Sequence, residues 1–219
     1  MIEPFEIPLW AELAAAGLGG LQGALFAGGV TDRRIDVLGV MLIGIGVALG
    51  GSLLRDILIG EPPAAFRGDW YLLVAAASAF VGMTLQRLLA RLDPIILVLD
   101  AVTIGLFGAI GTSKALSIGL PAVPAVFVGA AAAVGGSVLR DVTLNLPVTL
   151  FHVGSLYAVA AAAGSVLLVV LVALGIPVLY AAIAGVVLTT ITRLLAVLFG
   201  WTFPEQHALI VRRRRARAA

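Results

Sequence analysis

The sequence predicts an all-α polytopic membrane protein with seven transmembrane helices. Six of them form an inverted 3+3 repeat with bent second and fifth helices, and a seventh helix follows. Three observations predict this fold class. The 219-residue chain is 61% hydrophobic and only 12% charged, about half the roughly 25% charge of soluble domains. Its apolar stretches are long enough to cross a bilayer, and a seven-residue motif occurs in two of them.

The first three spans are expected at 8–29, 36–60 and 69–89. Each stretch supplies the ~20 apolar residues with which a helix crosses about 30 Å of hydrocarbon. Each is followed by a charged or turn-forming segment, namely Thr31-Asp32-Arg33-Arg34, Glu61-Pro62-Pro63 and Arg91-Leu92-Asp93-Pro94.

The other four spans are expected at 95–113, 122–145, 148–174 and 178–199. The last two are separated only by Gly175-Ile176-Pro177, which is enough for a tight turn between antiparallel helices. Because the number of spans is odd, the two ends of the chain are expected on opposite sides of the membrane.

The basic residues predict which side each end occupies, because positively charged loops stay cytoplasmic. With the amino terminus outside the cell, four loop arginines and five tail arginines face the cytoplasm, and only Arg67 and Lys114 face outward. The nine inward residues are Arg33, Arg34, Arg87, Arg91, Arg212, Arg213, Arg214, Arg215 and Arg217. Residues 201–219 are therefore expected to form a basic cytoplasmic tail.

An internal repeat divides the membrane part. The motif Gly-Gly-Ser-x-Leu-Arg-Asp occurs at 50–56 and again at 135–141, and the same offset of 85 residues (140 − 55) aligns Pro62 with Pro147. We expect repeat units at 1–89 and 95–174 and a seventh helix at 177–200. Each unit has three spans, so the second enters the membrane from the opposite side. Inverted repeats are typical of proteins that move solutes, with the path at the repeat interface.

The glycines of the motif are candidate pore elements. A helix that bends at a glycine pair exposes backbone carbonyls, and serine hydroxyls beside it could add oxygen ligands. The alternative is that the glycines are notches that let helices pack closely. The candidate break residues are Gly50, Gly51, Ser52, Gly135, Gly136 and Ser137.

The arginines of the motif lie near opposite faces of the membrane, and each is followed by an aspartate, Asp56 or Asp141. An unpaired charge in the bilayer costs ~3 kcal/mol or more. We therefore expect Arg55 to contact Glu12 on the first span and Arg140 to contact Asp100 on the fourth. The alternative is that both arginines extend to the interfaces.

Two further basic residues lie inside or at the end of a span. Lys114 could guard an outer vestibule or bind a lipid phosphate, or its side chain could extend to the interface. Arg193, in the last span, is expected to extend to the cytoplasmic interface.

At the duplicated motif the chain resembles the trimeric intracellular cation channel (TRIC) family, specifically its bacterial members. The resemblance extends over nearly the whole chain. It implies a homotrimer in the bacterial inner membrane, one pore in each protomer, and conduction of monovalent cations such as K⁺ and Na⁺ beside membrane lipids. It also implies that Gly50, Gly51, Gly135 and Gly136 flank the pore, with Arg55-Asp56 and Arg140-Asp141 following them. We expect these pairs, with Glu12 and Asp100, to set the width of the pore and gate it.

The sequence leaves two other functions open. A secondary transporter of a small solute can have the same inverted repeat, and a purely structural scaffold could use the glycines for packing alone. An enzyme is not expected, because the chain has no cysteine, two distant histidines (His152 and His207) and no Gly-x-Ser-x-Gly elbow. An Asp100–Asp141 dyad is disfavoured by the adjacent Arg140. We expect no cofactor, no structural metal ion and no nucleic acid partner.

Overall fold

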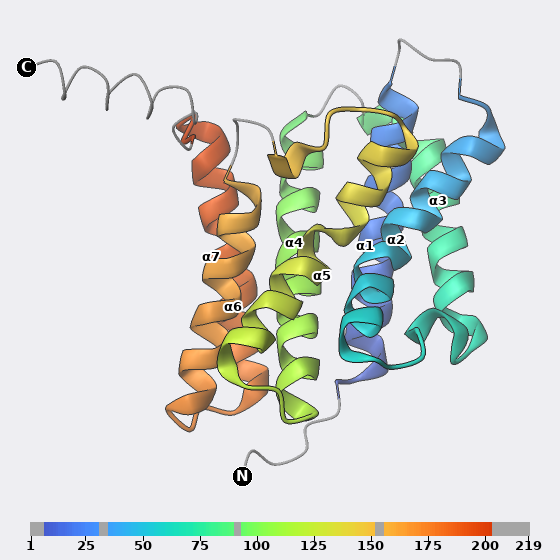
Figure 1. The fold of residues 1–219 in the computed structure, drawn as a ribbon. Helices are drawn as coiled ribbons and strands as arrows, with labels where there is room; N and C mark the ends of the chain where they lie inside the picture. Colours follow the sequence, from blue (N-terminus) through green and yellow to red (C-terminus); the bar gives the residue numbers. More distant parts are fainter. Residues whose placement is uncertain (1–6, 31–34, 90–92, 152–155, 203–219) are drawn as a thin grey trace, which may run out of the picture.

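A computed structural model of the chain describes residues 7–30, 35–89, 93–151 and 156–202. Within these residues it contains seven α-helices and two short 3₁₀ helices (Figure 1). They are α1 (Leu9–Gly29), α2 (Val37–Ile59), η1 (Ala64–Phe66), α3 (Asp69–Leu89), α4 (Asp93–Ser117), α5 (Ala122–Thr143), η2 (Thr149–Phe151), α6 (Tyr157–Ala173) and α7 (Val178–Leu198). The predicted basic tail lies almost wholly outside the described residues.

The seven helices confirm the predicted spans, with one clear correction. The sixth helix begins at Tyr157, nine residues later than the expected Val148. Its predicted start contains η2, which matches η1 in the first unit at the same offset of 85 residues (149 − 64). The correction therefore follows from the repeat itself, because Pro147 and Pro62 precede equivalent 3₁₀ turns.

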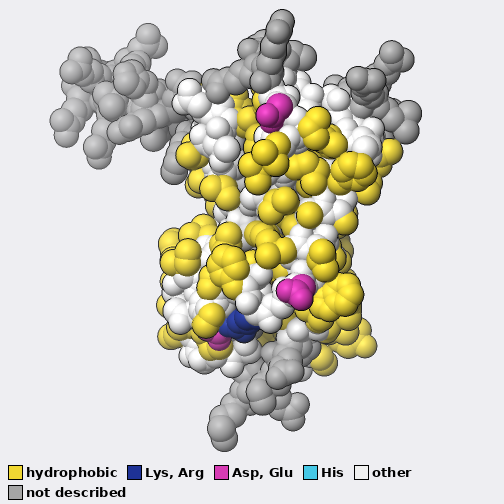
Figure 2. All heavy atoms as spheres, turned by 90° about the vertical axis from the view of Figure 1, so that its right-hand side faces the viewer, with side chains coloured by type: hydrophobic (Ala, Val, Ile, Leu, Met, Phe, Trp, Pro, Cys, Tyr) yellow, Lys and Arg dark blue, Asp and Glu magenta, His cyan; other side chains and the backbone are white. Residues whose placement is uncertain are grey.

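Among the described residues, four helices are long and apolar enough to cross a membrane by length and composition alone: α2, α4, α5 and α7. The shorter α6 is also apolar, with 17 residues. Figure 2 shows the face beside α3 covered by hydrophobic side chains, with charged side chains only toward its two ends. That distribution suits a protein surrounded by lipid along its sides and by water at its ends.

The helices alternate in direction, with α1, α2 and α3 on one side of the bundle and α4 to α7 at its centre and other side (Figure 1). In the first unit α1 packs against both α2 and α3. In the second unit α4 packs against α5 and α6, and it also packs against α7, which lies outside the repeat. The two units meet chiefly where α2 crosses α5. We call the two ends of the bundle the Glu12 end, where α1 begins, and the Asp100 end, where α4 begins.

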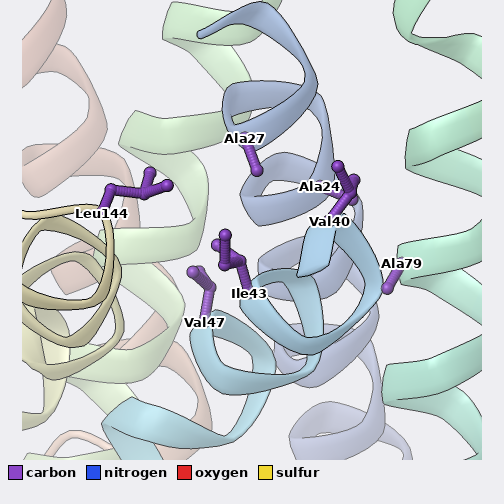
Figure 3. Packing of buried hydrophobic residues seen from close by; sticks show 7 residues of the cluster. All are labelled: Ala24, Ala27, Val40, Ile43, Val47, Ala79 and Leu144. Atoms are coloured by element: carbon purple, nitrogen blue, oxygen red, sulfur yellow. The ribbon is translucent and has the colours of Figure 1, made fainter. Parts of the chain in front are cut away.

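Small side chains bring these helices close together. One buried core lies among α1, α2 and α3 and reaches the end of α5 (Figure 3). Alanine and β-branched residues make up most of it, which allows close backbone approach in a membrane bundle. Its members are Ala24, Ala27, Val40, Ile43, Val47, Ala79 and Leu144.

Candidate functional site

The duplicated glycine pairs lie where the two repeat units touch. All four glycines are buried. A Cβ atom added to Gly50 would lie 2.9 Å from the Cα of Gly136, and one added to Gly136 would lie 2.6 Å from the carbonyl oxygen of Val47. Real Cβ atoms do not approach so closely, so only glycine allows this crossing of α2 and α5.

The glycines do not interrupt either helix. α2 is continuous from Val37 to Ile59 and α5 from Ala122 to Thr143. Helical structure is therefore continuous through both glycine pairs, and the pairs take part in the close packing that the alternative describes. That these residues line a pore stays a prediction. Ser52 and Ser137 donate hydrogen bonds within their own helices, to the carbonyls of Leu49 at 2.9 Å and Val134 at 2.8 Å.

A buried charge cluster lies at the Glu12 end. Arg55 is only 1% exposed, and its Nη1 forms the predicted ion pair with Glu12 Oε1 at 2.9 Å. Its Nε contacts Asp56 Oδ1 at 2.8 Å, and Tyr71 donates its hydroxyl hydrogen to Glu12. We call the group formed by Glu12, Arg55, Asp56, Tyr71 and Lys114 the Arg55 cluster. The burial of Arg55 excludes the alternative in which it extends to the interface.

Lys114 also points into the protein. It lies within α4, and its Nζ contacts Asp56 Oδ1 and Glu61 Oε2, each at 2.9 Å. Its side chain is 13% exposed, so it does not extend to the interface. Glu61, in the segment after α2, also pairs with Arg67 at 2.6 Å. Lys114 and, to a smaller extent, Arg67 hold the pKa of Glu61 below its usual range.

An equivalent arrangement lies at the Asp100 end. Arg140 Nη2 contacts Asp141 Oδ1 at 2.8 Å, and its guanidinium carbon lies 3.8 Å from the ring centre of Phe26. Asp141 also accepts a hydrogen bond from the backbone amide of Thr149 at 2.9 Å. In the first unit Asp56 accepts one from Ala64 at 2.6 Å. Each aspartate thus fixes its arginine and the 3₁₀ turn that follows.

The expected ion pair of Arg140 with Asp100 is not formed. Asp100 instead lies 3.4 Å from Nη2 of Arg193 and accepts hydrogen bonds from Gln22 at 2.8 Å and Tyr157 at 3.3 Å. Arg193 belongs to α7, which has no counterpart in the repeat, so the symmetry argument could not include it. The expectation that Arg193 extends to the interface is also wrong, because it is 6% exposed. Asp100, Arg140, Asp141, Tyr157 and Arg193 form what we call the Arg140 cluster.

Sequence reasoning missed the tyrosines. Tyr71 donates to the carboxylate of Glu12 and Tyr157 to that of Asp100, and each lies near the start of the third helix of its unit. Under the repeat offset Tyr71 aligns with position 156, one residue before Tyr157. A search that allowed a shift of one residue would have found the pair.

The two clusters differ in the space beside them. At the Asp100 end a cavity of about 670 Å³ is lined by Gln22, Gln86, Asp100, Arg140, Tyr157 and Arg193, among others. At the Glu12 end the space beside Glu12, Ser52, Arg55 and Tyr71 is about 10 Å³, room for one water molecule at most.

Phe107 of α4 packs against both α1 and α2 beside the small space. Its side chain lies 3.3 Å from the position of a Cβ on Gly19 and 3.0 Å from that of a Cβ on Gly51. Phe107 also borders the small space at the Arg55 cluster. The cavity at the Asp100 end is therefore large enough for hydrated small solutes, whereas the space beside the Arg55 cluster is not.

The sequence matches one family model, described as glycine transporter, over residues 9–87 and 97–173. A membrane protein of Deinococcus radiodurans, labelled UPF0126, is 34% identical over 158 residues, which is 71% of this chain and 72% of that protein. The UPF0126 inner membrane protein YadS of Escherichia coli K12 is 30% identical over 191 residues, 86% of this chain and 90% of that protein.

Two solved structures have the same fold. One, which concerns conductance through TRIC cation channels, has a TM-score of 0.80 and 28% identity, and the match covers 90% of this chain and 96% of that one. The other is the TRIC trimeric intracellular cation channel orthologue from Rhodobacter sphaeroides. It has a TM-score of 0.80 and 26% identity, and the match covers 88% of this chain and 98% of that one.

Proposed function

The chain belongs to the family of the glycine-transporter model and is a bacterial member of the trimeric intracellular cation channel family, and we therefore propose that it is a membrane channel for cations. It is a multi-pass membrane protein, as its relatives are. Its structural relatives are channels rather than enzymes, which agrees with the sequence.

One observation carries the proposal: a carboxylate, Asp100, on the wall of a cavity of about 670 Å³ that opens at one end of the bundle. A fixed negative charge raises the local concentration of cations and lowers their barrier to entry. The two motif arginines would oppose cation entry if they were unpaired. Each, however, contacts the aspartate that follows it in the sequence, at 2.8 Å in both cases.

The proposed path runs between the two repeat units of one protomer. From the cavity it passes Phe107 and reaches the Arg55 cluster, so that it is lined by α1, α2, α4 and α5. In this proposal the path is closed beside Arg55, and the small space bordered by Phe107 and the Arg55 cluster supports that interpretation. Opening would require the ion pairs of Arg55 to rearrange. The glycine pairs would let α2 and α5 move against each other without side chains in the way.

The finer assignments follow from the same family and from the charges. We infer that potassium and sodium are the permeating ions and that three copies assemble, each with its own pore. The repeat units 1–89 and 95–174, the helix 177–200 and the tail 201–219 are the proposed divisions. The excess of loop and tail arginines favours an external Glu12 end and a cytoplasmic Asp100 end in the inner membrane. Membrane lipids would surround the apolar sides.

Planar bilayer recording tests the proposal. Purified protein under a potassium gradient should give discrete current steps with a reversal potential near that of potassium. Arg55→Gln and Arg140→Gln should each change unitary conductance or open probability, because each leaves carboxylates without their cation. Absence of current steps after reconstitution of the folded protein, or current steps that are unaltered in both variants, would contradict the proposed channel function.

A secondary transporter is the second candidate, and the description of the matching family as glycine transporter favours it. The cavity holds both a carboxylate, Asp100, and guanidinium groups, Arg140 and Arg193, which suits a zwitterion such as glycine. Uptake of labelled glycine into proteoliposomes discriminates the two functions. A transporter would show saturable uptake without current steps, whereas a channel would show steps and no glycine accumulation.

A further inference from the structure

Arg193 is held in an unusual way for a buried cation. Its Nη2 lies 3.4 Å from Asp100, beyond the 2.7–3.2 Å of a normal N–H···O hydrogen bond. Its Nε and Nη1 find no hydrogen-bond partner among the described residues. By contrast, all three nitrogens of Arg55 donate to carboxylates, with N···O distances from 2.8 to 3.2 Å.

Charge and ring contact hold Arg193 in place instead. Its guanidinium carbon lies 4.6 Å from the ring centre of Tyr157, within the range of a cation–π interaction. The side chain borders the large cavity together with Asp100. A guanidinium has five N–H donors, and those on Nε and Nη1 of Arg193 form no hydrogen bond with the described residues. The ion pair of Arg193 with Asp100 is therefore weak for a buried pair.

The groups around Asp100 are suited to a small cation. Gln22 reaches one carboxylate oxygen and can present its amide oxygen instead of its nitrogen by a half-turn. The hydroxyl oxygen of Tyr157 lies 3.3 Å from Asp100 and can accept as well as donate. Displacement of Arg193 would thus leave a carboxylate, an amide and a hydroxyl, which are all oxygen ligands, facing the cavity.

We propose that Asp100 is a binding site for a monovalent cation at the wall of this cavity, and that Arg193 is its tethered competitor. When Arg193 contacts Asp100, its guanidinium occupies the place of the cation. When it swings away along the Tyr157 ring, the site opens to a cation from the cavity. Because α7 lies outside the repeat, movement of this one helix would control access to Asp100. The inference rests on the proposed cation channel.

Removal of the competitor tests the idea by binding rather than by current. In Arg193→Met, potassium should stabilise the detergent-solubilised protein in a saturable way, with a midpoint about 5–150-fold lower than in the wild type. Choline chloride at equal concentration controls for ionic strength. The double variant Asp100→Asn/Arg193→Met should lose the potassium-specific rise in Tm. Arg193→Lys, which keeps the charge, should behave as the wild type does.

The other outcomes are decisive too. If Arg193→Met is folded and responds equally to potassium and choline, the inference is wrong. If Arg193→Met does not fold, Arg193→Gln provides the same test with a neutral side chain that can still bond to Asp100, and an equal response there is equally contrary. Stabilisation of the wild type by glycine that Arg193→Met abolishes would also overturn it, because Arg193 would then hold a carboxylate. Potassium binding without any current would instead contradict the channel function alone.

Discussion

Asp56 of α2 and Asp141 of α5 hold equivalent positions in the two repeat units. Each pairs with the arginine that precedes it and accepts a hydrogen bond from the backbone amide eight residues later, Ala64 at 2.6 Å and Thr149 at 2.9 Å. Each carboxylate therefore connects the end of a long helix, a buried guanidinium and the following 3₁₀ turn. Asp56 additionally pairs with Lys114 of the other unit.

These contacts predict that Asp56→Asn is strongly destabilising. Asp56 is fully buried, and loss of its charge leaves two cations, Arg55 and Lys114, short of a partner. Breaking a buried ion pair from one side costs about 3–5 kcal/mol. Thermal unfolding in detergent should show a large fall in Tm for Asp56→Asn. The fall should be smaller for Asp141→Asn, because its carboxylate contacts one cation among the described residues.

Asp69→Asn is the matched control, because Asp69 is exposed at the start of α3. Its Tm should stay close to that of the wild type. Equal Tm values for Asp56→Asn and Asp69→Asn would show that the Arg55 cluster contributes little to stability.

The glycine crossing gives a second prediction, with a control on the same helix. In Gly51→Ala the new Cβ would lie 2.5 Å from the carbonyl oxygen of Ala132, which is backbone and cannot turn aside. At Gly46 the nearest atom would be Leu139 Cδ2 at 3.4 Å, an ordinary contact. Alanine is favoured over glycine in a helix by about 1 kcal/mol. Gly46→Ala should therefore keep or raise Tm, whereas Gly51→Ala should lower it.

Cross-linking can show that the loss comes from separation of the helices. A cysteine pair placed on the facing sides of α2 and α5 should cross-link efficiently in the Gly46→Ala background and poorly in the Gly51→Ala background. Equal efficiency in both would mean that the crossing tolerates a methyl group.

Much of the fold could be predicted from the sequence, because hydrophobic length and charge placement act locally along the chain. The start and end of α3, for example, agree with the expected span. The repeat supplied the relation between distant helices, since Arg55 and Arg140 occur in the same Gly-Gly-Ser-x-Leu-Arg-Asp motif. What the sequence left ambiguous was the use of glycine: a pair in a helix permits either a bend or a close crossing, and only the position of the neighbouring helix decides between them.

The site was predictable where the symmetry of the repeat holds and not where it fails. The Arg55–Glu12 pair follows from burial and the cost of an unpaired charge. At the Asp100 end, Arg193 of α7 contacts Asp100 in place of Arg140. The repeat could not predict this contact, because α7 occurs only once. Lys114 illustrates a second limit. Its ion pairs with Asp56 and Glu61 depend on the angle between α2 and α4, which the sequence does not specify.

Glu61 makes the response to acid predictable. Lys114 and then Arg67 lower the pKa of this carboxyl below its ordinary value of about 4.3. A lowered folded-state pKa adds stability above the ordinary pKa, and this stability is lost as the pH falls through the folded-state value. The difference in Tm between the wild type and Glu61→Gln should therefore be constant from about pH 7 to pH 5 and shrink only below about pH 4.

The corresponding difference in the free energy of unfolding should be small, about 1 kcal/mol or less, because the pairs of Glu61 are partly exposed to water. Arg67→Gln should reduce it without removing it, since Lys114 stays in contact. A difference that disappears already near pH 6 would mean that Glu61 titrates at a raised pKa, contrary to this network.

Phe107 provides the most direct test of the closed path. Its ring lies against the backbone of Gly19 and Gly51 and borders the small space beside Arg55, where the proposed path from the cavity would pass. Phe107→Ala would remove the ring from the narrowest part of the proposed path. In planar bilayers this variant should show a higher open probability or larger unitary current than the wild type, whereas Phe107→Leu, which keeps most of the volume, should show a smaller change.

Stability separates the two ways in which this prediction could fail. Truncation of a buried phenylalanine costs about 3–5 kcal/mol, so Tm should fall even if conduction is unaffected. A folded Phe107→Ala protein with a lower Tm and unchanged current steps would mean that the ions pass elsewhere. A lower Tm with increased current is the expected pair of results, because one ring then both fills the core between α1, α2 and α4 and blocks the path through it.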